Sequence, residues 1–440
     1  MSAIIIPGPA YLRNMAKDKL NIAIAGAGIA GLINGLVLQR AGHSVSIFEA
    51  RSRTGGRIQS ISLAGMVVEC GPEFIHGKLK ETIGLLKKYN IPYDPIDGKM
   101  YGVRAGKLSE SDYTTDGWDL LIEKMKSLEK DIPLREFLEN NFPGDERIEL
   151  RKSATGFAEG FDLADPETAS THALILEWQH EESGQFRIPA GYGTLILSLE
   201  NEFKAGDGKI FLNHPVETVN WNSDNIILGI KGKQKFSVDK LVISLPLSIL
   251  NSSSPAEESI RFFPAIDERI IELNQIGFGS VVKIIMIWEK SFWKDLIPEA
   301  QFIFSDQFIP TWWTQYPEDL PMLTGWFGGT RALKFAKESD GFFRDKAIES
   351  LSSIFSLPLQ KIKEGLKECR IFNWKNEPWS RGAYSYSKVG SEKAKAAFRQ
   401  PLLNMVYFSG EAYYEGPYPG TVEAAVVNGL QTAELLLREL

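Results

Sequence analysis

A glycine-rich hexapeptide near the N-terminus limits what this chain can fold into more than any other feature. The segment GAGIAG, residues 26–31, follows the apolar run LNIAIA of residues 20–25. A continuous apolar run of this length is typical of a parallel strand that is covered on both faces. Residues 31–39 then carry apolar side chains at helical spacing, and residues 44–48 (SVSIF) are a second expected strand. This order predicts a right-handed βαβ unit.

Each glycine of the hexapeptide has a separate physical use. Gly26 permits a tight turn, Gly28 lets the backbone approach a pyrophosphate, and Gly31 allows the helix to pack closely on the strand. The helix N-terminus offers unpaired N–H groups to phosphates. Glu49 ends the second strand, where a carboxylate can accept hydrogen bonds from both hydroxyls of an adenosine ribose. These residues predict a dinucleotide site, but they do not separate FAD from NAD.

Size, charge and cysteine content exclude several classes of protein. The 440 residues allow two or three domains of roughly 150 residues each. The net charge of −7 argues against nucleic acid as a partner, since such a partner favours a basic face. Two cysteines give neither a disulfide framework nor the spacing of a metal site, so we expect no metal and a reducing, cytoplasmic location. No apolar stretch approaches the ~20 residues of a membrane span, and residues 1–17 are interpreted as an N-terminal extension.

Apolar periodicity predicts further elements along the chain. Helices are expected over residues 81–89, 118–130, 134–140 and 421–440. Strands are expected over residues 209–212, 216–221, 226–230, 241–245, 281–288 and 406–409.

A second segment separates the two dinucleotides. Residues 49–58 read EARSRTGGRI, and after a dinucleotide fingerprint this sequence resembles a signature of the FAD-containing amine oxidase superfamily. Gly55 and Gly56 can form a loop against a cofactor, and Arg57 can neutralise a pyrophosphate with its forked donors. The resemblance implies an α/β fold, in which a Rossmann-like FAD-binding domain of the GR2/PHBH-like type is interleaved with an α+β substrate-binding domain.

The resemblance covers nearly the whole chain after residue 18. Its main segments are GPEFIHG (71–77), RIPAGYGTLILSL (187–199), LVISLPLSIL (241–250), GFGSVVKIIMIWEKSFW (277–293), WKNEPWSRGAYS (374–385) and FSGEAYYEGPYPGTVEAAVVNGLQTA (408–433). The HG ending of the first segment resembles polyamine oxidases more than monoamine oxidases. The implied FAD-binding domain comprises residues 18–80, 198–270 and 377–440, and the implied substrate-binding domain comprises residues 81–197 and 271–376.

The positions that match the family's motifs are expected to bind FAD. They are Gly26, Gly28, Ala30, Gly31, Glu49, Arg51, Gly56, Arg57, Gly71, Pro72, Glu73, Phe74, Val216, Trp379, Gly410, Glu411, Thr421 and Val422. The helix that begins near Thr421 would point its positive end at the flavin. Monoamine oxidases attach their flavin to a cysteine where this chain has Ala383, so the resemblance implies a non-covalent FAD.

Lys283 and Tyr384 are implied as catalytic residues. Lys283 stands among apolar residues of an expected strand, and a buried ammonium group is costly unless it is paired, which favours a functional role. In the family this lysine holds a water near flavin N5. Tyr384 would form one wall of an aromatic substrate cage, whose second tyrosine in monoamine oxidases aligns with Thr421. Phe74, His76 and Thr421 are expected to line the substrate pocket.

The resemblance implies oxidation of an amine, with oxygen as the second substrate. A hydride equivalent passes from the carbon next to the amine nitrogen to flavin N5. Oxygen reoxidises the flavin and yields hydrogen peroxide, and the imine is hydrolysed to an aldehyde. The reacting amine must be neutral, which costs ~4–5 kcal/mol at pH 7 for an alkyl amine of pKa ~10, and an aromatic pocket lowers this cost. Since aromatic side chains more often belong to the core, about a third of the following are expected to line the pocket: Trp312, Trp313, Tyr316, Trp326, Phe327, Tyr384, Tyr413 and Tyr414.

Three other functions stay open at this point. An L-amino acid oxidase would need an arginine to clamp the substrate carboxylate, and Arg104, Arg187, Arg261 and Arg381 are conceivable. A desaturase or porphyrinogen-type oxidase would act on apolar substrates near membranes, and the sequence shows no amphipathic anchoring helix. A non-catalytic FAD-binding protein would not need to keep the lysine and tyrosine. The sequence names neither the amine nor the oligomeric state, which we expect to be a monomer or a homodimer.

Overall fold

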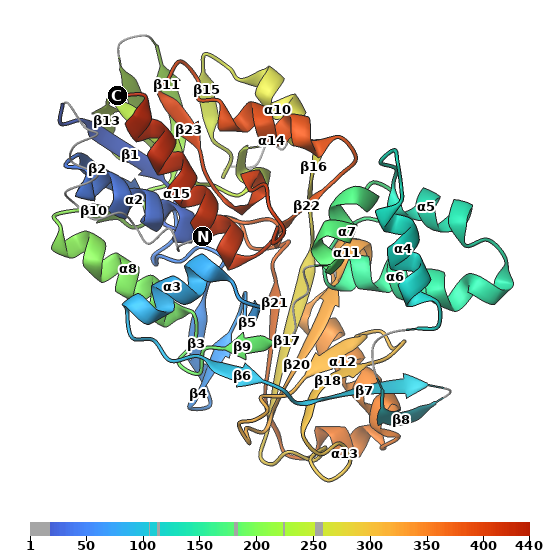
Figure 1. Cartoon of the computed structure of the whole chain (residues 1–440). Helices are drawn as coiled ribbons and strands as arrows, with labels where there is room; N and C mark the ends of the chain where they lie inside the picture. Colours follow the sequence, from blue (N-terminus) through green and yellow to red (C-terminus); the bar gives the residue numbers. More distant parts are fainter. Residues whose placement is uncertain (1–17, 105, 112–114, 180–183, 223–224, 251–257) are drawn as a thin grey trace.

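The computed structural model describes residues 18–440 except 105, 112–114, 180–183, 223–224 and 251–257. The predicted N-terminal extension, residues 1–17, lies outside the described residues. Two large sheets organise the fold, and a group of helices lies beside the second sheet (Figure 1).

The first sheet is parallel and has the strand order β10-β2-β1-β14-β23. Its strands are β1 (Asn21–Ala25), β2 (Ser44–Phe48), β10 (Lys209–Phe211), β14 (Lys240–Ile243) and β23 (Val406–Phe408). Helix α2 (Ile29–Arg40) connects β1 to β2, so the predicted βαβ unit is present. The predicted α/β class is confirmed by this sheet.

The apolar character of β1 follows from what covers its two faces. Ile22 and Ile24 pack in one core with α2 and with α15 (Val422–Arg438). Ala23 and Ala25 pack in another core against an overlying four-stranded sheet. That sheet has the order β13-β12-β11-β15, from β11 (Val216–Trp221), β12 (Ile226–Ile230), β13 (Lys235–Val238) and β15 (Arg261–Phe263).

The parallel sheet, the four-stranded sheet that overlies it, and helices α2 and α15 form a first body, on which two further helices pack. Helix α8 (Gly193–Ala205) packs on α2, and α3 (Lys80–Lys88) packs on α15. Glu423 of α15 accepts hydrogen bonds from the backbone N–H groups of Glu81 and Thr82, at 2.8 and 2.7 Å. The predicted division of the chain into two domains stays a prediction, although residues of α3, which it assigned to the substrate-binding part, contact α15.

The second sheet has the order β21-β17-β20-β19-β18-β7-β8, and its strands pair antiparallel except β18 with β7. They are β7 (Lys99–Arg104), β8 (Lys107–Glu110), β17 (Val281–Trp288), β18 (Ala300–Phe304), β19 (Thr311–Trp313), β20 (Met322–Gly328) and β21 (Leu366–Asn373). All eight residues of β17 are buried. Val282, Ile284 and Met286 pack in a core with α12 (Asp340–Phe355), so the alternation of side chains along a strand turns Lys283 to the opposite face.

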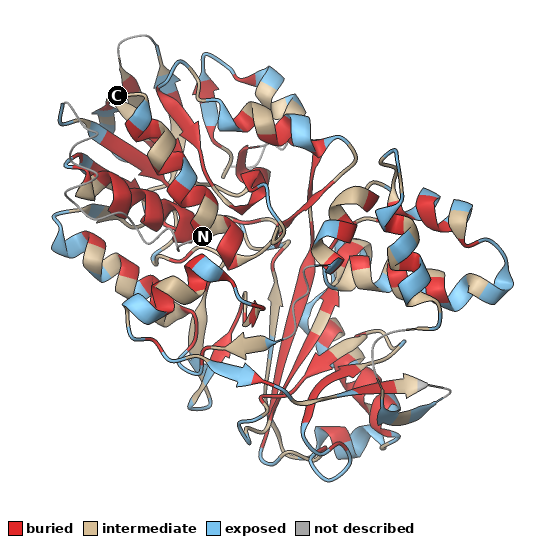
Figure 2. Ribbon diagram, in the orientation of Figure 1, coloured by how far each residue is buried: buried red, intermediate tan, exposed pale blue. Residues whose placement is uncertain are grey.

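The group of helices beside the second sheet has a core of its own. It contains α4 (Trp118–Lys126), α5 (Leu134–Asn141), α6 (Ile148–Gly160) and α7 (Thr171–Gln179). Figure 2 shows buried residues along the strands of both sheets and exposed residues on the outer sides of these helices.

Shorter elements lie between the first body and a second body, which consists of the seven-stranded sheet and the helix α12 packed on it. A three-stranded sheet of order β5-β9-β6 lies between them. In addition, β3 pairs with β4, and β16 pairs with β22. The strands are β3 (Ser60–Leu63), β4 (Met66–Glu69), β5 (Phe74–His76), β6 (Asp94–Ile96), β9 (Gln185–Arg187), β16 (Ile276–Phe278) and β22 (Ser385–Ser387). The remaining α-helices are α9 (Leu247–Leu250), α10 (Asp267–Leu273), α11 (Gly329–Lys334), α13 (Leu359–Lys363) and α14 (Ser391–Arg399). Within the described ranges, no helix is long and apolar enough to cross a bilayer.

Candidate active site

A cavity of about 640 Å³ is lined by residues from both bodies and from the group of helices. The turn between β1 and α2, strand β17, helices α6 and α7 and the start of α15 all contribute to its wall. Every residue that the sequence assigned to the cofactor or the substrate lines this cavity except Gly31 and Val216. Val216 lies at the start of β11, and Gly31 lies in the first turn of α2.

The glycines of the first turn divide into two kinds. Gly26 has a φ of +104°, and a Cβ there would lie 2.5 Å from the carbonyl oxygen of Ser244. A Cβ on Gly31 would lie 2.1 Å from the carbonyl oxygen of Gly26, which explains the close packing of helix on strand. A Cβ on Gly28 would meet no atom within 4 Å, although Gly28 lines the cavity. The turn itself therefore requires Gly26 and Gly31, whereas Gly28 leaves room on the cavity side.

Helices α2 and α15 both begin at the cavity wall. Gly28 precedes α2, and Thr421 precedes α15 and accepts a hydrogen bond from the N–H of Ala424 at 3.2 Å. The N-terminus of a helix carries partial positive charge and unpaired N–H groups, which favour phosphate or a developing negative charge. The open side of Gly28, the two helix ends and the size of the cavity fit a flavin adenine dinucleotide.

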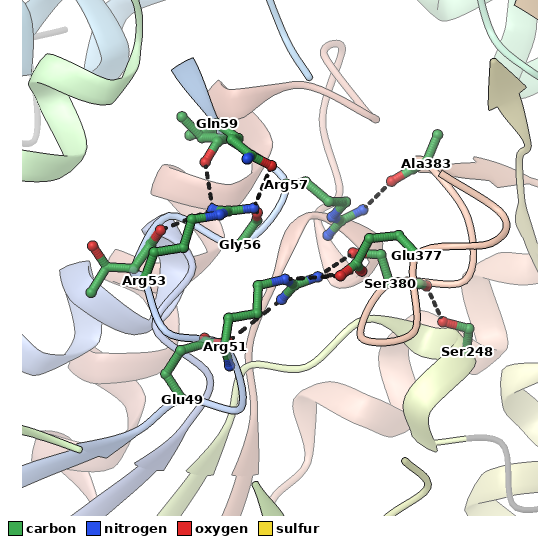
Figure 3. Close-up of polar contacts among 12 residues, drawn as sticks. Glu49, Arg51, Arg53, Gly56, Arg57, Gln59, Ser248, Glu377, Ser380 and Ala383 are labelled. Carbon is green, nitrogen blue, oxygen red and sulfur yellow. Dashed lines mark hydrogen bonds and ion pairs between the residues drawn. The ribbon is translucent and has the colours of Figure 1, made fainter. Parts of the chain in front are cut away.

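Carboxylates hold the loop that follows β2 (Figure 3). Glu49 is buried and accepts hydrogen bonds from the backbone N–H groups of Ala27 and Arg51, at 2.8 and 2.9 Å. The guanidinium of Arg51 donates to Glu377 at 2.5 and 3.2 Å and to Ser380 at 2.9 Å. Glu377 and Ser380 were missed by the sequence analysis, because nothing in the sequence indicates which arginine they face.

Arg57 and Glu411 were each predicted to contact the cofactor, and the structure pairs them. Arg57 donates to Glu411 at 2.8 Å and to the carbonyl oxygen of Ala383 at 2.6 Å. Glu411 also accepts a hydrogen bond from the hydroxyl of Ser385 at 2.6 Å. This pair fixes the loop of residues 374–385 against the first body.

Lys283 is fully buried, and its ammonium group has a carboxylate partner. Its Nζ atom lies 2.8 Å from Oε2 of Glu73 and 3.2 Å from the carbonyl oxygen of Gly71. Glu73 also lies 3.2 Å from Arg187 and accepts a hydrogen bond from Gln315 at 3.1 Å. Burial alone would raise the pKa of Glu73, but the charges of Lys283 and Arg187 lower it to about 2. Glu73 was predicted as a cofactor residue, and its contacts here are those of a counter-ion to the buried Lys283 and the partly buried Arg187.

Aromatic side chains make up much of the rest of the wall. Of the eight aromatic candidates named from the sequence, Trp313, Trp326 and Tyr384 line the cavity, whereas Trp312 and Phe327 are buried in the core. The hydroxyl of Tyr384 donates to the carbonyl oxygen of Phe161, and burial raises the pKa of that hydroxyl well above its ordinary value.

His76 lines the same cavity and is neutral over the ordinary pH range. Burial lowers the pKa of its imidazole to about 4. Its ring packs edge-on against Phe161, with 5.3 Å between ring centroids. A neutral imidazole can offer a donor or an acceptor to a substrate without adding charge.

Two carboxylic acids on the wall were missed by the sequence analysis. Asp162 follows α6 and accepts a hydrogen bond from Trp178 at 2.9 Å, and Glu177 lies on α7. Burial raises the pKa of Glu177 well above its ordinary value, and the neighbouring charge of Asp162 raises it further. These acids stand in no recognisable motif, and only the packing of α6 and α7 brings them to one place.

The arginines considered for an amino acid oxidase lie elsewhere. Arg187 pairs with Glu73, Arg261 lies 3.0 Å from Glu217, and Arg381 lies 2.6 Å from Glu258. None of these three lines the cavity, and the side chain of Arg104 is outside the described part of the structure.

Comparison with known proteins agrees with this geometry. Lysine-specific histone demethylase 1B of Mus musculus is 25% identical over 453 residues, which cover 94% of this chain and 52% of the demethylase. The chain thus spans about half of the length of the first demethylases that it matches. Polyamine oxidase 2 of Arabidopsis thaliana is 24% identical over 94% of this chain and 87% of its own length.

Solved structures of amine oxidases share the fold. Putrescine oxidase bound to putrescine has a TM-score of 0.81 and 21% identity, with 95% of this chain and 99% of that chain covered. Cyclohexylamine oxidase from Brevibacterium oxydans has a TM-score of 0.78 and 19% identity, with 96% and 99% covered.

The profile that describes flavin containing amine oxidoreductases matches residues 29–437, nearly the whole described chain. This chain therefore belongs to the flavin containing amine oxidoreductase family, whose members act on CH–NH donors.

Proposed function

We propose that this protein is an FAD-dependent amine oxidase that binds its FAD without a covalent bond. The observation that carries the proposal is one cavity that joins the open side of Gly28, two helix N-termini, the buried Lys283 and an aromatic wall. When bound there, FAD supplies the acceptor for the two electrons that leave the substrate. The amine becomes an imine that water hydrolyses to an aldehyde, and oxygen becomes hydrogen peroxide.

The aromatic wall prepares the substrate. Phe74, Trp313, Trp326 and Tyr384 surround part of the cavity with apolar surface. Such a surface disfavours a charged ammonium group, and this offsets part of the ~4–5 kcal/mol that neutralising an alkyl amine costs at pH 7. Thr421 stands where a second cage tyrosine would stand in monoamine oxidases, so the wall is open on that side to a bulkier substrate.

Lys283 has one donor to offer at the cavity. An ammonium group has three hydrogens, and the bonds to Glu73 and Gly71 use two of them. We infer that the third hydrogen holds a water at the reacting centre, and that Glu73 keeps the lysine in place for this role.

The acid pair on α6 and α7 favours a cationic substrate over an anionic one. Asp162 carries the negative charge of this pair, because the pKa of Glu177 is raised well above its ordinary value. Arg51 and Arg57, the arginines among the described lining residues, are paired with Glu377 and Glu411. A free carboxylate on the substrate would therefore find no unpaired guanidinium among the described lining residues. This favours an amine over an amino acid as the substrate.

Further parts of the proposal rest on the sequence. Ala383 lines the cavity where a covalent link would need cysteine, and neither Cys70 nor Cys369 lines it, which supports a non-covalent FAD. A cytoplasmic location and a monomeric or homodimeric state remain predictions.

Peroxide release from a panel of mono-, di- and polyamines and L-amino acids tests this function. We expect peroxide with at least one amine and none with the amino acids. Lys283→Met should keep FAD and lower the rate on the order of 10²-fold, because one preorganised donor is lost. Lys290→Met, at an exposed position just after β17, is the matched control and should act like wild type. Peroxide formed only from amino acids would overturn the proposal.

A further inference from the structure

A second, small cavity of about 30 Å³ shares Glu73 with the large one. Its wall includes Glu69 at the end of β4, Arg187 at the end of β9 and Thr324 on β20. None of these three lines the large cavity, so the small cavity adds groups that the proposed reaction has not used.

Three buried polar atoms lie on the residues of this wall. They are Oε2 of Glu69, Oγ1 of Thr324 and Nε of Arg187, and none has a hydrogen-bond partner among the described residues. Glu69 is 8% exposed and Thr324 is 0% exposed. Buried polar atoms are costly when unpaired, and a cavity above roughly 10–15 Å³ can hold a water if it offers two to four polar partners. The small cavity meets both conditions, since Arg187 can donate while Thr324 and Glu69 can accept or donate.

The orientation of Glu69 is fixed from its other side. Its Oε1 atom accepts hydrogen bonds from the backbone N–H of Tyr192 at 2.5 Å and from the hydroxyl of Ser60 at 2.9 Å. The second carboxyl oxygen, Oε2, is therefore the atom that can contact a water in the cavity or carry the proton. Burial raises the pKa of Glu69 to about 7, against the opposing effects of the Tyr192 N–H and of Lys283. Glu69 thus changes charge near neutral pH.

We propose that a water bound in the small cavity links Glu69 to the Glu73–Lys283 pair, and that Glu69 acts through it as a positioning residue whose charge sets the net charge of the group that holds Lys283 at the large cavity. The inference rests on the proposed function, because it deepens the role given there to Lys283. It also adds a water site and a positioning residue to the machinery.

The charges near Glu69 determine how its protonation changes the net charge beside the large cavity. Lys283 and Arg187 are cations and Glu73 is an anion, while Cys70 and the hydroxyl of Tyr192 lie within electrostatic reach and are neutral, since burial raises the pKa of both. With Glu69 ionised, two carboxylates balance two cations. With Glu69 protonated, the group carries one excess positive charge beside the large cavity. Excess positive charge favours reduced, negatively charged flavin, so a falling pH should make the bound flavin easier to reduce.

Infrared difference spectra of the FAD-loaded protein, between about pH 5.5 and about pH 8.5, test this directly. Wild type should lose one protonated-carboxyl band as the pH rises, and Glu69→Gln should lack that change. Thr324→Val removes one partner of the water with little change in shape, and should move the midpoint of the titration upward, since the ionised form loses solvation. Thr324→Ser keeps the hydroxyl and should restore the wild-type midpoint.

The flavin reduction potential gives a second readout. Glu69→Gln should have a higher potential than wild type at about pH 8.5 and the same potential at about pH 5.5. Glu364→Gln, in an exposed ion pair with Lys361, should match wild type at both values. A carboxyl titration that survives in Glu69→Gln, or a midpoint that Thr324→Val leaves unchanged, would overturn the inference.

These outcomes separate the two proposals. If wild type shows no carboxyl titration but is bleached normally by amines, the inference alone is contradicted. A titration that behaves as described in a protein that no amine reduces contradicts the proposed function and leaves the water site standing.

Discussion

Glu73 shows at the scale of single residues how neighbours decide what a side chain does. The sequence predicted that Lys283 is buried, and the structure agrees, because the apolar residues of β17 are covered on both faces. It did not predict the partner of the lysine. Glu73 comes to Lys283 from a loop more than two hundred residues earlier, and Arg187 completes the group from a third segment. Ion pairs of this kind follow from packing, which local patterns do not contain.

Glu73→Gln should destabilise the protein by about 3–5 kcal/mol, because the buried Lys283 and the partly buried Arg187 lose their shared counter-charge. Chemical denaturation of the FAD-free protein measures the change. Glu364→Gln removes a carboxylate from an exposed pair and should leave the midpoint unchanged. Equal midpoints for Glu73→Gln and wild type would mean that Glu73 does not stabilise the two cations.

Glu69 should make stability depend on pH. Its pKa is about 7 in the folded chain against an ordinary value of 4.5, so the folded state holds the proton more tightly than the unfolded state. The protonated Glu69 therefore adds its full contribution to the free energy of unfolding below pH 4.5, and this contribution is lost as the pH rises to about 7. Over this window wild type should lose about 3 kcal/mol relative to Glu69→Gln. Parallel stability curves for the two proteins would contradict the raised pKa.

At the scale of elements, the sequence was most informative where one segment carries the whole signal. The strand–turn–helix–strand start, β11, β12 and β17 all lie at or within two residues of their predicted limits. Their apolar runs and glycines act locally, so no distant residue is needed to recognise them. Strands β18 to β20 and helix α12 were not predicted. Their apolar residues follow the spacing of a strand or a helix less regularly, and their burial is evident only in the assembled sheet.

Helices α6 and α7 carry the main gap in the predicted site. Asp162 and Glu177 line the cavity only because these two helices pack together, and neither acid belongs to a motif. Lys283 and Tyr384 were found because the resemblance marks their segments. The part of the wall that lies in recognisable motifs, Phe74, His76 and Thr421 included, was therefore predictable, and the part that α6 and α7 supply was not.

The turn before α2 offers a test that separates folding from cofactor binding. Gly28→Ala should leave the fold unchanged, since the new methyl group meets no atom within 4 Å, but should weaken FAD binding on the order of tenfold or more by occupying the space of the pyrophosphate. Gly31→Ala should destabilise the fold itself, because its methyl group would lie 2.1 Å from a carbonyl oxygen. Gly84→Ala, in an open position on α3, is the matched control. Tight FAD binding by Gly28→Ala would show that the cofactor does not approach this turn.

At the scale of the whole molecule, the cavity depends on segments that are interleaved along the chain. The first body supplies the dinucleotide turn and the start of α15, the second sheet supplies Lys283, and the group of helices supplies the acids. The family match over residues 29–437 begins directly after the dinucleotide turn and spans the other parts. The cavity wall is thus assembled from separate parts of the molecule: the sheets place the dinucleotide turn and Lys283, and the group of helices places Asp162 and Glu177.

Absorption spectroscopy of the purified protein shows whether it holds FAD and whether amines reduce that FAD. After acid precipitation the supernatant should be yellow, since the FAD is expected to be released. In the intact protein without oxygen, an amine should bleach the flavin, and air should restore the colour. Bleaching by amino acids alone would favour an amino acid oxidase, and a colourless protein prepared in the presence of FAD would contradict the account as a whole.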